Sequence, residues 1–124
     1  MKGEDERPSG LENFSAHRKA LELFDLAVGD LVQLAKKPET ARLVSQQIAS
    51  ADSVAANIEE GYGRGSRAEY AQFLIFSRGS AQETSGRYYR LRHWLPEEVV
   101  ESRRALCQEI IAILSATIKT LRSE

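Results

Sequence analysis

Arginine side chains are concentrated between residues 64 and 92, where six arginines face two carboxylates, Glu69 and Glu83. A guanidinium binds phosphate through paired hydrogen bonds and stacks on exposed bases, so such a surface could bind nucleic acid. The alternative is a solvated face, or pairing between subunits with Glu59, Glu60 and Glu83, which is the more common role of a charge cluster. The candidate residues for binding nucleic acid or a partner are Arg64, Arg67, Arg78, Arg87, Arg90 and Arg92.

A second group of polar residues flanks the segments predicted to be buried. Gly79 and Ser80 lie beside this group and permit close approach of two helices. We expect a hydrogen-bonded network that locks the second and third predicted helices together. Its members are Asn57, Glu60, Arg78 and Glu83.

Metal-binding and catalytic chemistry has few candidates. His17, His93 and Cys107 fall on three different predicted helices, whereas metal sites in bundles use Glu-x-x-His pairs or clustered His and Cys. We interpret His17 as a hydrogen-bonded, partly buried side chain, His93 as a surface or interface residue, and Cys107 as a small core residue. The sequence therefore predicts no metal, no cofactor and no catalytic residue.

The glycines Gly61, Gly63 and Gly65 resemble half of a phosphate-binding loop. They lack the preceding strand and the Lys-Ser/Thr ending that give such loops their chemistry, and the chain has no Gly-x-Ser-x-Gly motif. Glycine is costly inside a helix and common in the left-handed conformation just after one, so we expect a turn between two helices. We predict a protein that is not an enzyme.

The bulk composition is that of one ordinary globular domain of 124 residues, with 42% hydrophobic and 28% charged residues. No apolar run approaches the roughly 20 residues of a membrane helix, and the N-terminus lacks the apolar segment of a secretory signal. A single cysteine excludes an internal disulfide, so we expect a cytoplasmic protein. The net charge of −1 gives no overall attraction to nucleic acid.

Hydrophobic periodicity predicts an all-α fold, an antiparallel up-down-up-down four-helix bundle over residues 13–124, preceded by a disordered arm at residues 1–12. The helices are expected at about 13–37, 39–61, 67–94 and 96–122. Asn13 is a plausible N-cap, and Ser66 with Glu69 forms a capping box.

Buried stripes are expected on each helix. In the first helix the seam is Phe14, His17, Leu21, Phe24, Val28, Leu31 and Ala35, with Leu23, Ala27 and Leu34 on a second apolar face. In the third helix the stripe is Tyr70, Leu74, Ser77, Ala81, Thr84, Tyr88, Leu91 and Leu95. The last helix is apolar on more than one face, and Phe73 and Phe76 lie outside the stripe, where they widen the core or face another subunit. These surplus apolar faces predict a homo-oligomer.

The order Asn57-Ile58-x-Glu60-Gly61-Tyr62-Gly63-Arg64, then Glu69-Tyr70-x-x-Phe73-Leu74, then Arg78-Gly79-Ser80-x-x-Glu83 resembles the bacterial family of ribosomal-RNA intervening-sequence proteins, often labelled S23. The similarity extends to Lys19-Ala20, Leu23 and Gln47-Ile48-x-x-Ala51. The resemblance implies a four-helix bundle that assembles as a pentameric ring.

Relatives in this family imply two kinds of role. Some are encoded in intervening sequences of large-subunit ribosomal RNA genes, and others are accessory proteins of diversity-generating retroelements that bind nucleic acid and a reverse transcriptase. Here Ser50 stands where the family often has arginine, and the charge is slightly acidic. We expect an interaction or scaffold module whose partner is another copy of itself, and as the alternative a nucleic-acid-binding accessory that binds RNA or DNA.

Overall fold

The computed structural model describes residues 10–123, which contain four long helices and no strand. The long helices are α1 (Ser15–Leu31), α2 (Ala41–Tyr62), α3 (Arg67–Arg90) and α4 (Glu97–Arg122). Short 3-10 helices lie at Leu11–Asn13, Leu34–Lys36 and Leu91–His93. The prediction of an all-helical fold with four helices is confirmed. None of the helices in this part of the chain combines the length and apolar character needed to cross a membrane.

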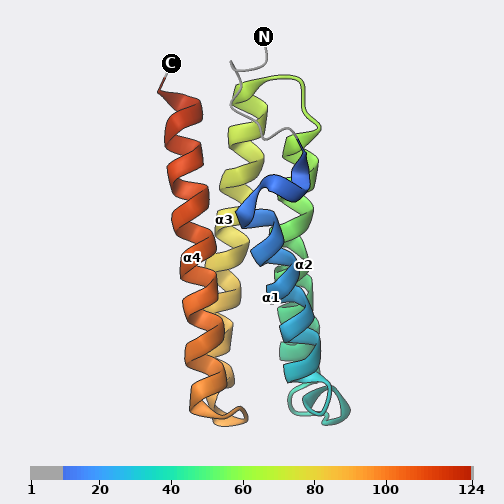
Figure 1. The fold of residues 1–124 in the computed structure, drawn as a ribbon. Coiled ribbons are helices and arrows are strands. Elements are labelled where there is room, and N and C mark those ends of the chain that lie inside the picture. The colour runs from blue at the N-terminus through green and yellow to red at the C-terminus, as the bar shows by residue number, and fades with distance from the viewer. Residues whose placement is uncertain (1–9, 124) are drawn as a thin grey trace.

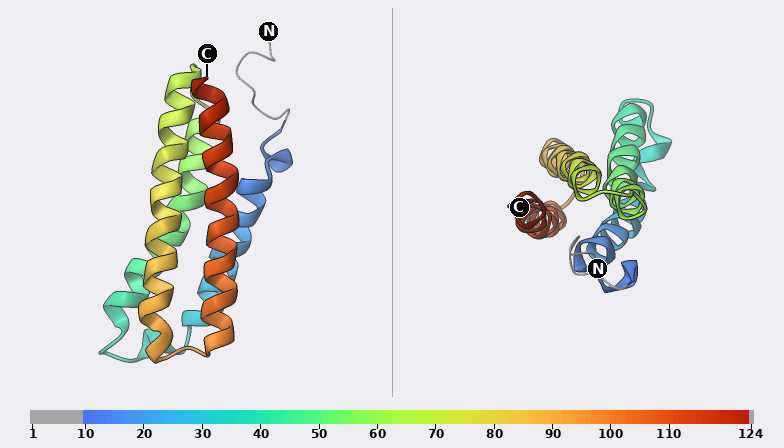
Figure 2. Two further views of the ribbon diagram at one scale, coloured as in Figure 1. Left: turned by 90° about the vertical axis from the view of Figure 1, so that its left-hand side faces the viewer. Right: turned by 90° about the horizontal axis from the view of Figure 1, so that it is seen from above.

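The helices lie side by side, with the α2–α3 connection at one end and the α1–α2 and α3–α4 connections at the other (Figure 1). Helices α1 and α3 each pack against both α2 and α4. Seen from above, α1 and α3 occupy opposite corners (Figure 2). The outer faces of α1 and α3 therefore point to different sides of the molecule.

The first helix is shorter than the predicted range of 13–37. Helix α1 begins after Phe14, which takes the N-cap position expected for Asn13, and it ends at Leu31. The buried hydroxyl of Thr40 donates to the carbonyl of Leu34 at 2.6 Å, and this carbonyl also accepts from the amide of Lys37 at 3.2 Å. These bonds fold the chain into a 3-10 turn before Lys37. The prediction of one continuous helix to that residue was therefore wrong.

The third helix also ends early, at Arg90, where the chain tightens into a 3-10 turn. The carbonyl of Leu91 accepts from the amides of Trp94 and Leu95 at 2.9 and 3.0 Å. Pro96 disfavours helical backbone at Leu95, so the chain cannot continue as one helix into α4. The predicted ranges 39–61 and 96–122 differ from α2 and α4 by one or two residues, which is the usual uncertainty of helix ends.

Residues 1–9 of the predicted disordered arm lie outside the described residues. The rest of that prediction is wrong at Leu11 and Glu12, because they belong to a 3-10 helix. Leu11 is partly buried against the core. The chain thus begins to pack on the bundle before α1 starts.

Burial confirms the predicted stripe of α3 and corrects that of α1. Seven of the eight residues of the α3 stripe are buried, and Leu95 is partly buried. Of the predicted seam of the first helix, Leu21 and Val28 on α1 and Ala35 in the 3-10 helix after it are exposed. Leu31 of the predicted seam is buried, as are Leu23 and Ala27 of the predicted second apolar face, and the α1 core also includes Ala16 and Ala20, which were not predicted. Alanine lets α1 lie close to its neighbours, and the larger Leu21 and Val28 are left outside.

The glycine segment closes the α2–α3 corner through one close contact. Gly61 is the last buried residue of α2, and a Cβ at this position would lie 2.8 Å from the Cβ of Phe73. Gly63 caps the helix with φ −85°, so the left-handed conformation expected here is not used. The corner therefore needs glycine for space at Gly61. Ser66 begins α3 as predicted, because its hydroxyl accepts from the amide of Glu69 at 3.1 Å.

Candidate interaction surfaces

The six arginines of the predicted face are divided among different contacts. Arg67 donates to the carbonyls of Thr120 and Leu121 at 3.1 and 3.2 Å, near the end of α4. Arg78 donates to the hydroxyl of Ser115 at 3.2 Å. Both residues therefore tie α3 to α4, and Arg67 satisfies carbonyls that a helix end leaves without an intrahelical partner.

Arg64 sits at the α2–α3 corner. Its Nη2 atom lies 3.3 Å from Oε2 of Glu60, and its guanidinium lies 4.8 Å from the centroid of the Phe73 ring. Arg90 and Arg92 are exposed near the end of α3. These three arginines thus occupy the two opposite ends of the long helices.

Arg87 is buried, which corrects its prediction as part of an exposed binding face. It is 7% exposed, and its Nη1 atom donates to Gln47 Oε1 at 3.0 Å and to Ser50 Oγ at 3.1 Å. Its position three residues after a buried threonine places it against α2. The sequence signal that was available is the small side chain of Ser50, which leaves room for a long side chain from α3.

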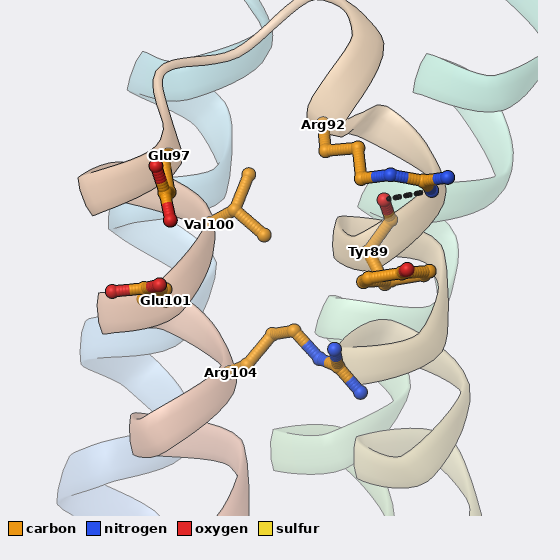
Figure 3. Close-up of a pocket in the computed structure, with 6 residues that line it drawn as sticks. All are labelled: Tyr89, Arg92, Glu97, Val100, Glu101 and Arg104. Atoms are coloured by element: carbon orange, nitrogen blue, oxygen red, sulfur yellow. Dashed lines mark hydrogen bonds between the residues drawn. The ribbon is translucent and has the colours of Figure 1, made fainter.

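A pocket of about 400 Å³ lies between the end of α3 and the start of α4 (Figure 3). The guanidinium carbons of Arg92 and Arg104 lie 4.0 and 5.0 Å from the centroid of the Tyr89 ring, and Figure 3 shows this ring between them. Glu97 and Glu101 approach from the side of α4. The pocket therefore has one cationic wall and one anionic wall, and a phosphate bound to the arginines would face both carboxylates.

The predicted network of Asn57, Glu60, Arg78 and Glu83 does not form. Asn57 donates to the carbonyl and hydroxyl of Ser53, both at 2.9 Å within α2. Glu60 pairs with Arg64, and Glu83 lies 4.0 Å from Arg87. Each side chain turns to a partner four residues away in the chain or, for Arg78, to α4. Side chains three or four residues apart on a helix meet more easily than those on two helices, which explains the difference.

Helices α2 and α3 are locked by a different polar network, formed by Gln47, Ser50, Thr84 and Arg87. The Gln47 side chain donates to the carbonyl of Thr84 at 2.8 Å, and the hydroxyls of Ser50 and Thr84 are 2.9 Å apart. Two turns from Thr84 along α3, the hydroxyl of Ser77 donates to the carbonyl of Val54 at 2.7 Å. Thr84 and Ser77 belong to the predicted buried stripe of the third helix. Polar residues at buried positions were therefore the sequence signal for these hydrogen bonds.

A third polar cluster joins α1, α3 and α4 and was missed in the sequence. Nε and Nη2 of Arg103 donate to Oδ2 and Oδ1 of Asp30 at 2.8 and 2.9 Å, and the Tyr88 hydroxyl donates to Oδ2 at 2.7 Å. Burial and the Asp30 hydrogen bond raise the pKa of Tyr88 well above its ordinary value. The hydrogen bond to Asp30 also raises the pKa of Arg103. This cluster holds three helices of the bundle together, because its polar groups bond to one another across α1, α3 and α4.

The histidines and the cysteine lie as interpreted. His17 is 9% exposed and its Nε2 lies 2.7 Å from Oε2 of Glu59, while His93 is exposed beside Trp94. Cys107 is fully buried, and burial raises the pKa of its thiol to about 12. Within residues 10–123, no group of three or more His, Cys, Asp or Glu side chains is placed to hold a metal ion.

Large apolar side chains are exposed mainly on the outer faces of α1 and α3. Leu21, Val28 and Val32 are 45%, 46% and 51% exposed, and they follow one face of α1 into the residue after it. On α3, Phe76 is 48% exposed and packs edge-on against Phe73, with ring centroids 5.6 Å apart. The surplus apolar face expected on α4 is not exposed, because Ile111 and Ile113 are partly buried against the core.

Comparisons with known proteins identify the family. No curated protein matches the chain at a significant level. A solved structure from Bacteroides thetaiotaomicron VPI-5482, a protein of unknown function from the S23 ribosomal protein family, is 26% identical with a TM-score of 0.78. The similarity covers 84% of this chain and 98% of that one. The model of the 23S rRNA-intervening sequence proteins matches residues 12–116, so the chain belongs to that family.

Proposed function

We propose that this chain is a cytoplasmic, non-enzymatic interaction module that assembles as a homo-oligomer, with the pentameric ring that the family resemblance implies. The observation that carries the proposal is the exposed apolar stripe of Leu21, Val28 and Val32 on the outer face of α1. An exposed apolar stripe on a small domain marks a surface that another protein covers.

The positions of the exposed apolar residues support a ring. Helices α1 and α3 lie at opposite corners of the bundle (Figure 2), and the exposed stripe belongs to α1 whereas the exposed Phe76 belongs to α3. Two different surfaces that pair between copies give a head-to-tail interface, and such an interface closes into a ring when the rotation allows it. A single self-complementary surface would instead give a dimer.

Light scattering coupled to size-exclusion chromatography tests the assembly. We expect an oligomer of the unmodified chain and a monomer of the Leu21→Glu/Val28→Glu variant, with helix content by circular dichroism unchanged. The matched control is Ala112→Glu/Ala116→Glu, which places the same charges on exposed positions of α4. A monomeric wild type would refute the assembly, and dissociation by the control alone would assign it to α4 instead.

A second candidate function is nucleic-acid binding, favoured by the cluster of Tyr89, Arg90 and Arg92 at the end of α3. Tyr89 is 48% exposed and its ring lies between the guanidinium groups of Arg92 and Arg104, and an unpaired base can stack on the outer face of such a guanidinium. It predicts binding of single-stranded RNA or DNA that weakens as salt rises and is lost in Arg90→Glu/Arg92→Glu. The Arg64→Glu/Arg67→Glu variant tests the other end of the predicted face. Affinity that neither salt nor these substitutions change would contradict this function.

A further inference from the structure

A polar groove of about 300 Å³ lies between α2 and α3, away from the pocket of Figure 3. Four short side chains line it, and Gln46, Glu83 and Arg87 complete the lining. Short side chains leave space above the buried guanidinium of Arg87. The wall residues are Ala49, Ser50, Ser53 and Ser80.

The Arg87 guanidinium is satisfied on one edge alone. Nη1 donates to the neutral oxygens of Gln47 and Ser50. Nε has no hydrogen-bond partner among residues 10–123, and Nη2 lies 4.0 Å from Oε2 of Glu83, beyond hydrogen-bond distance. A buried cation thus lacks the close carboxylate that a buried charge requires.

The carboxylate that Arg87 lacks is present at another arginine of this chain, Arg103. There the Nε and Nη2 atoms each donate to one carboxylate oxygen of Asp30, at 2.8 and 2.9 Å. A guanidinium holds a carboxylate in this two-bond geometry because its donors form a rigid fork. Arg87 lines the groove, so a carboxylate that enters the groove approaches this guanidinium.

The outer face of α1 offers a carboxylate of this kind. Asp25 is exposed and lies four residues after Leu21 and three before Val28, within the apolar stripe. No hydrogen bond or ion pair joins it to another residue of the described chain. On α3, the residues Phe76, Ser80, Glu83 and Arg87 share one face with the same spacing. An exposed aromatic ring therefore lies on the same face as the groove.

We propose that Asp25 of one copy enters the α2–α3 groove of a second copy and pairs its carboxylate with the guanidinium of Arg87. Leu21 and Val28 then cover the apolar surface beside the groove. The side chain of Glu83 is 64% exposed, so it can turn toward solvent as Asp25 enters. This assignment rests on the proposed homo-oligomer and names the residues that pair within it.

Sedimentation over a dilution series tests the assignment. Loss of a charge from a desolvated pair weakens association strongly, so Asp25→Asn is expected to raise the dissociation constant by about tenfold or more. The matched control is Glu22→Gln, which removes an exposed carboxylate from a neighbouring face of α1 and leaves the constant unchanged. Glu83→Gln is expected to leave assembly intact.

Cross-linking places the residues directly. A chain carrying Asp25→Cys is mixed with one carrying Ser53→Cys, and we expect a disulfide between the two copies, whereas Glu22→Cys in place of Asp25→Cys gives none. Cys107 is fully buried and does not compete. A monomeric wild type would overturn this assignment together with the proposed function. An oligomer that Asp25→Asn does not weaken, or that gives no such disulfide, would overturn this assignment alone.

Discussion

The carboxylate of Asp30 accepts two hydrogen bonds from the guanidinium of Arg103, although the two residues are 73 positions apart in the chain. Their side chains are 9% and 17% exposed, so water screens the pair little. The Tyr88 hydroxyl donates a third hydrogen bond to the same carboxylate. One carboxylate of α1 thereby fixes the position of this helix against both α3 and α4.

The first prediction concerns this pair. Asp30→Asn removes the charge that compensates Arg103 and is expected to lower the free energy of unfolding by roughly 3 kcal/mol, because it leaves a partly buried cation unpaired. Urea denaturation followed by circular dichroism measures the change.

The control for this prediction is the exposed pair of Lys19 and Glu109, which also joins α1 to α4, at 3.0 Å. Glu109→Gln is expected to cost less than about 1 kcal/mol, because exposed ion pairs contribute little. Equal losses in the two variants would show that Asp30 has no special structural role.

The sequence predicted the α3 stripe correctly because that helix packs on two neighbours along its whole length. The same approach was only partly right on α1: Leu23, Ala27 and Leu31 are buried as predicted, but Leu21 and Val28 were chosen over Ala16 and Ala20. Hydrophobicity favours the larger side chains for the core, but helices that approach closely select small ones. Which rule applies depends on the distance between helices, and a single sequence does not contain that distance.

Polar partners were harder to predict than the fold. The lock between α2 and α3 joins Gln47 to Thr84, and the α1 cluster joins Asp30 to Arg103. These pairs depend on the rotation of each helix about its axis. Asn57, Glu60, Arg78 and Glu83 were placed on the correct pair of helices, yet a small rotation directs each of them to another partner.

The second prediction concerns alkaline pH and Cys107. Folding favours the neutral thiol, whose pKa is raised to about 12, whereas an exposed thiol has a pKa of about 8.5. The stabilising contribution is fully present below the unfolded pKa and is lost as pH rises toward the folded one. Stability is therefore expected to fall by up to about 1.4 kcal/mol per pH unit above pH 9.

Denaturation at pH 8, 9 and 10 measures this loss, and Cys107→Ala is the comparison. The variant starts less stable because a buried side chain has been shortened, but its stability should change less over this interval. Tyr88 responds to pH in the same way, but its unfolded pKa is about 10, so its contribution begins to be lost only at the upper end of this interval and is shared by both proteins. A wild type and a variant with the same pH dependence would contradict the prediction.

The last prediction concerns Gly61, where α2 meets the start of α3. A methyl group at this position would lie 2.8 Å from the Cβ of Phe73 and 3.3 Å from the carbonyl oxygen of Tyr70, and neither atom is the flexible end of a side chain. Gly61→Ala is therefore expected to destabilise the protein by roughly 1–3 kcal/mol, because one helix must move away from the other.

Gly79→Ala is the matched control within α3, since a Cβ there meets nothing within 4 Å. This control is expected to gain about 0.5–1 kcal/mol from the better helix propensity of alanine. Thermal or urea unfolding that ranks Gly61→Ala above Gly79→Ala would show that the corner does not depend on this close contact.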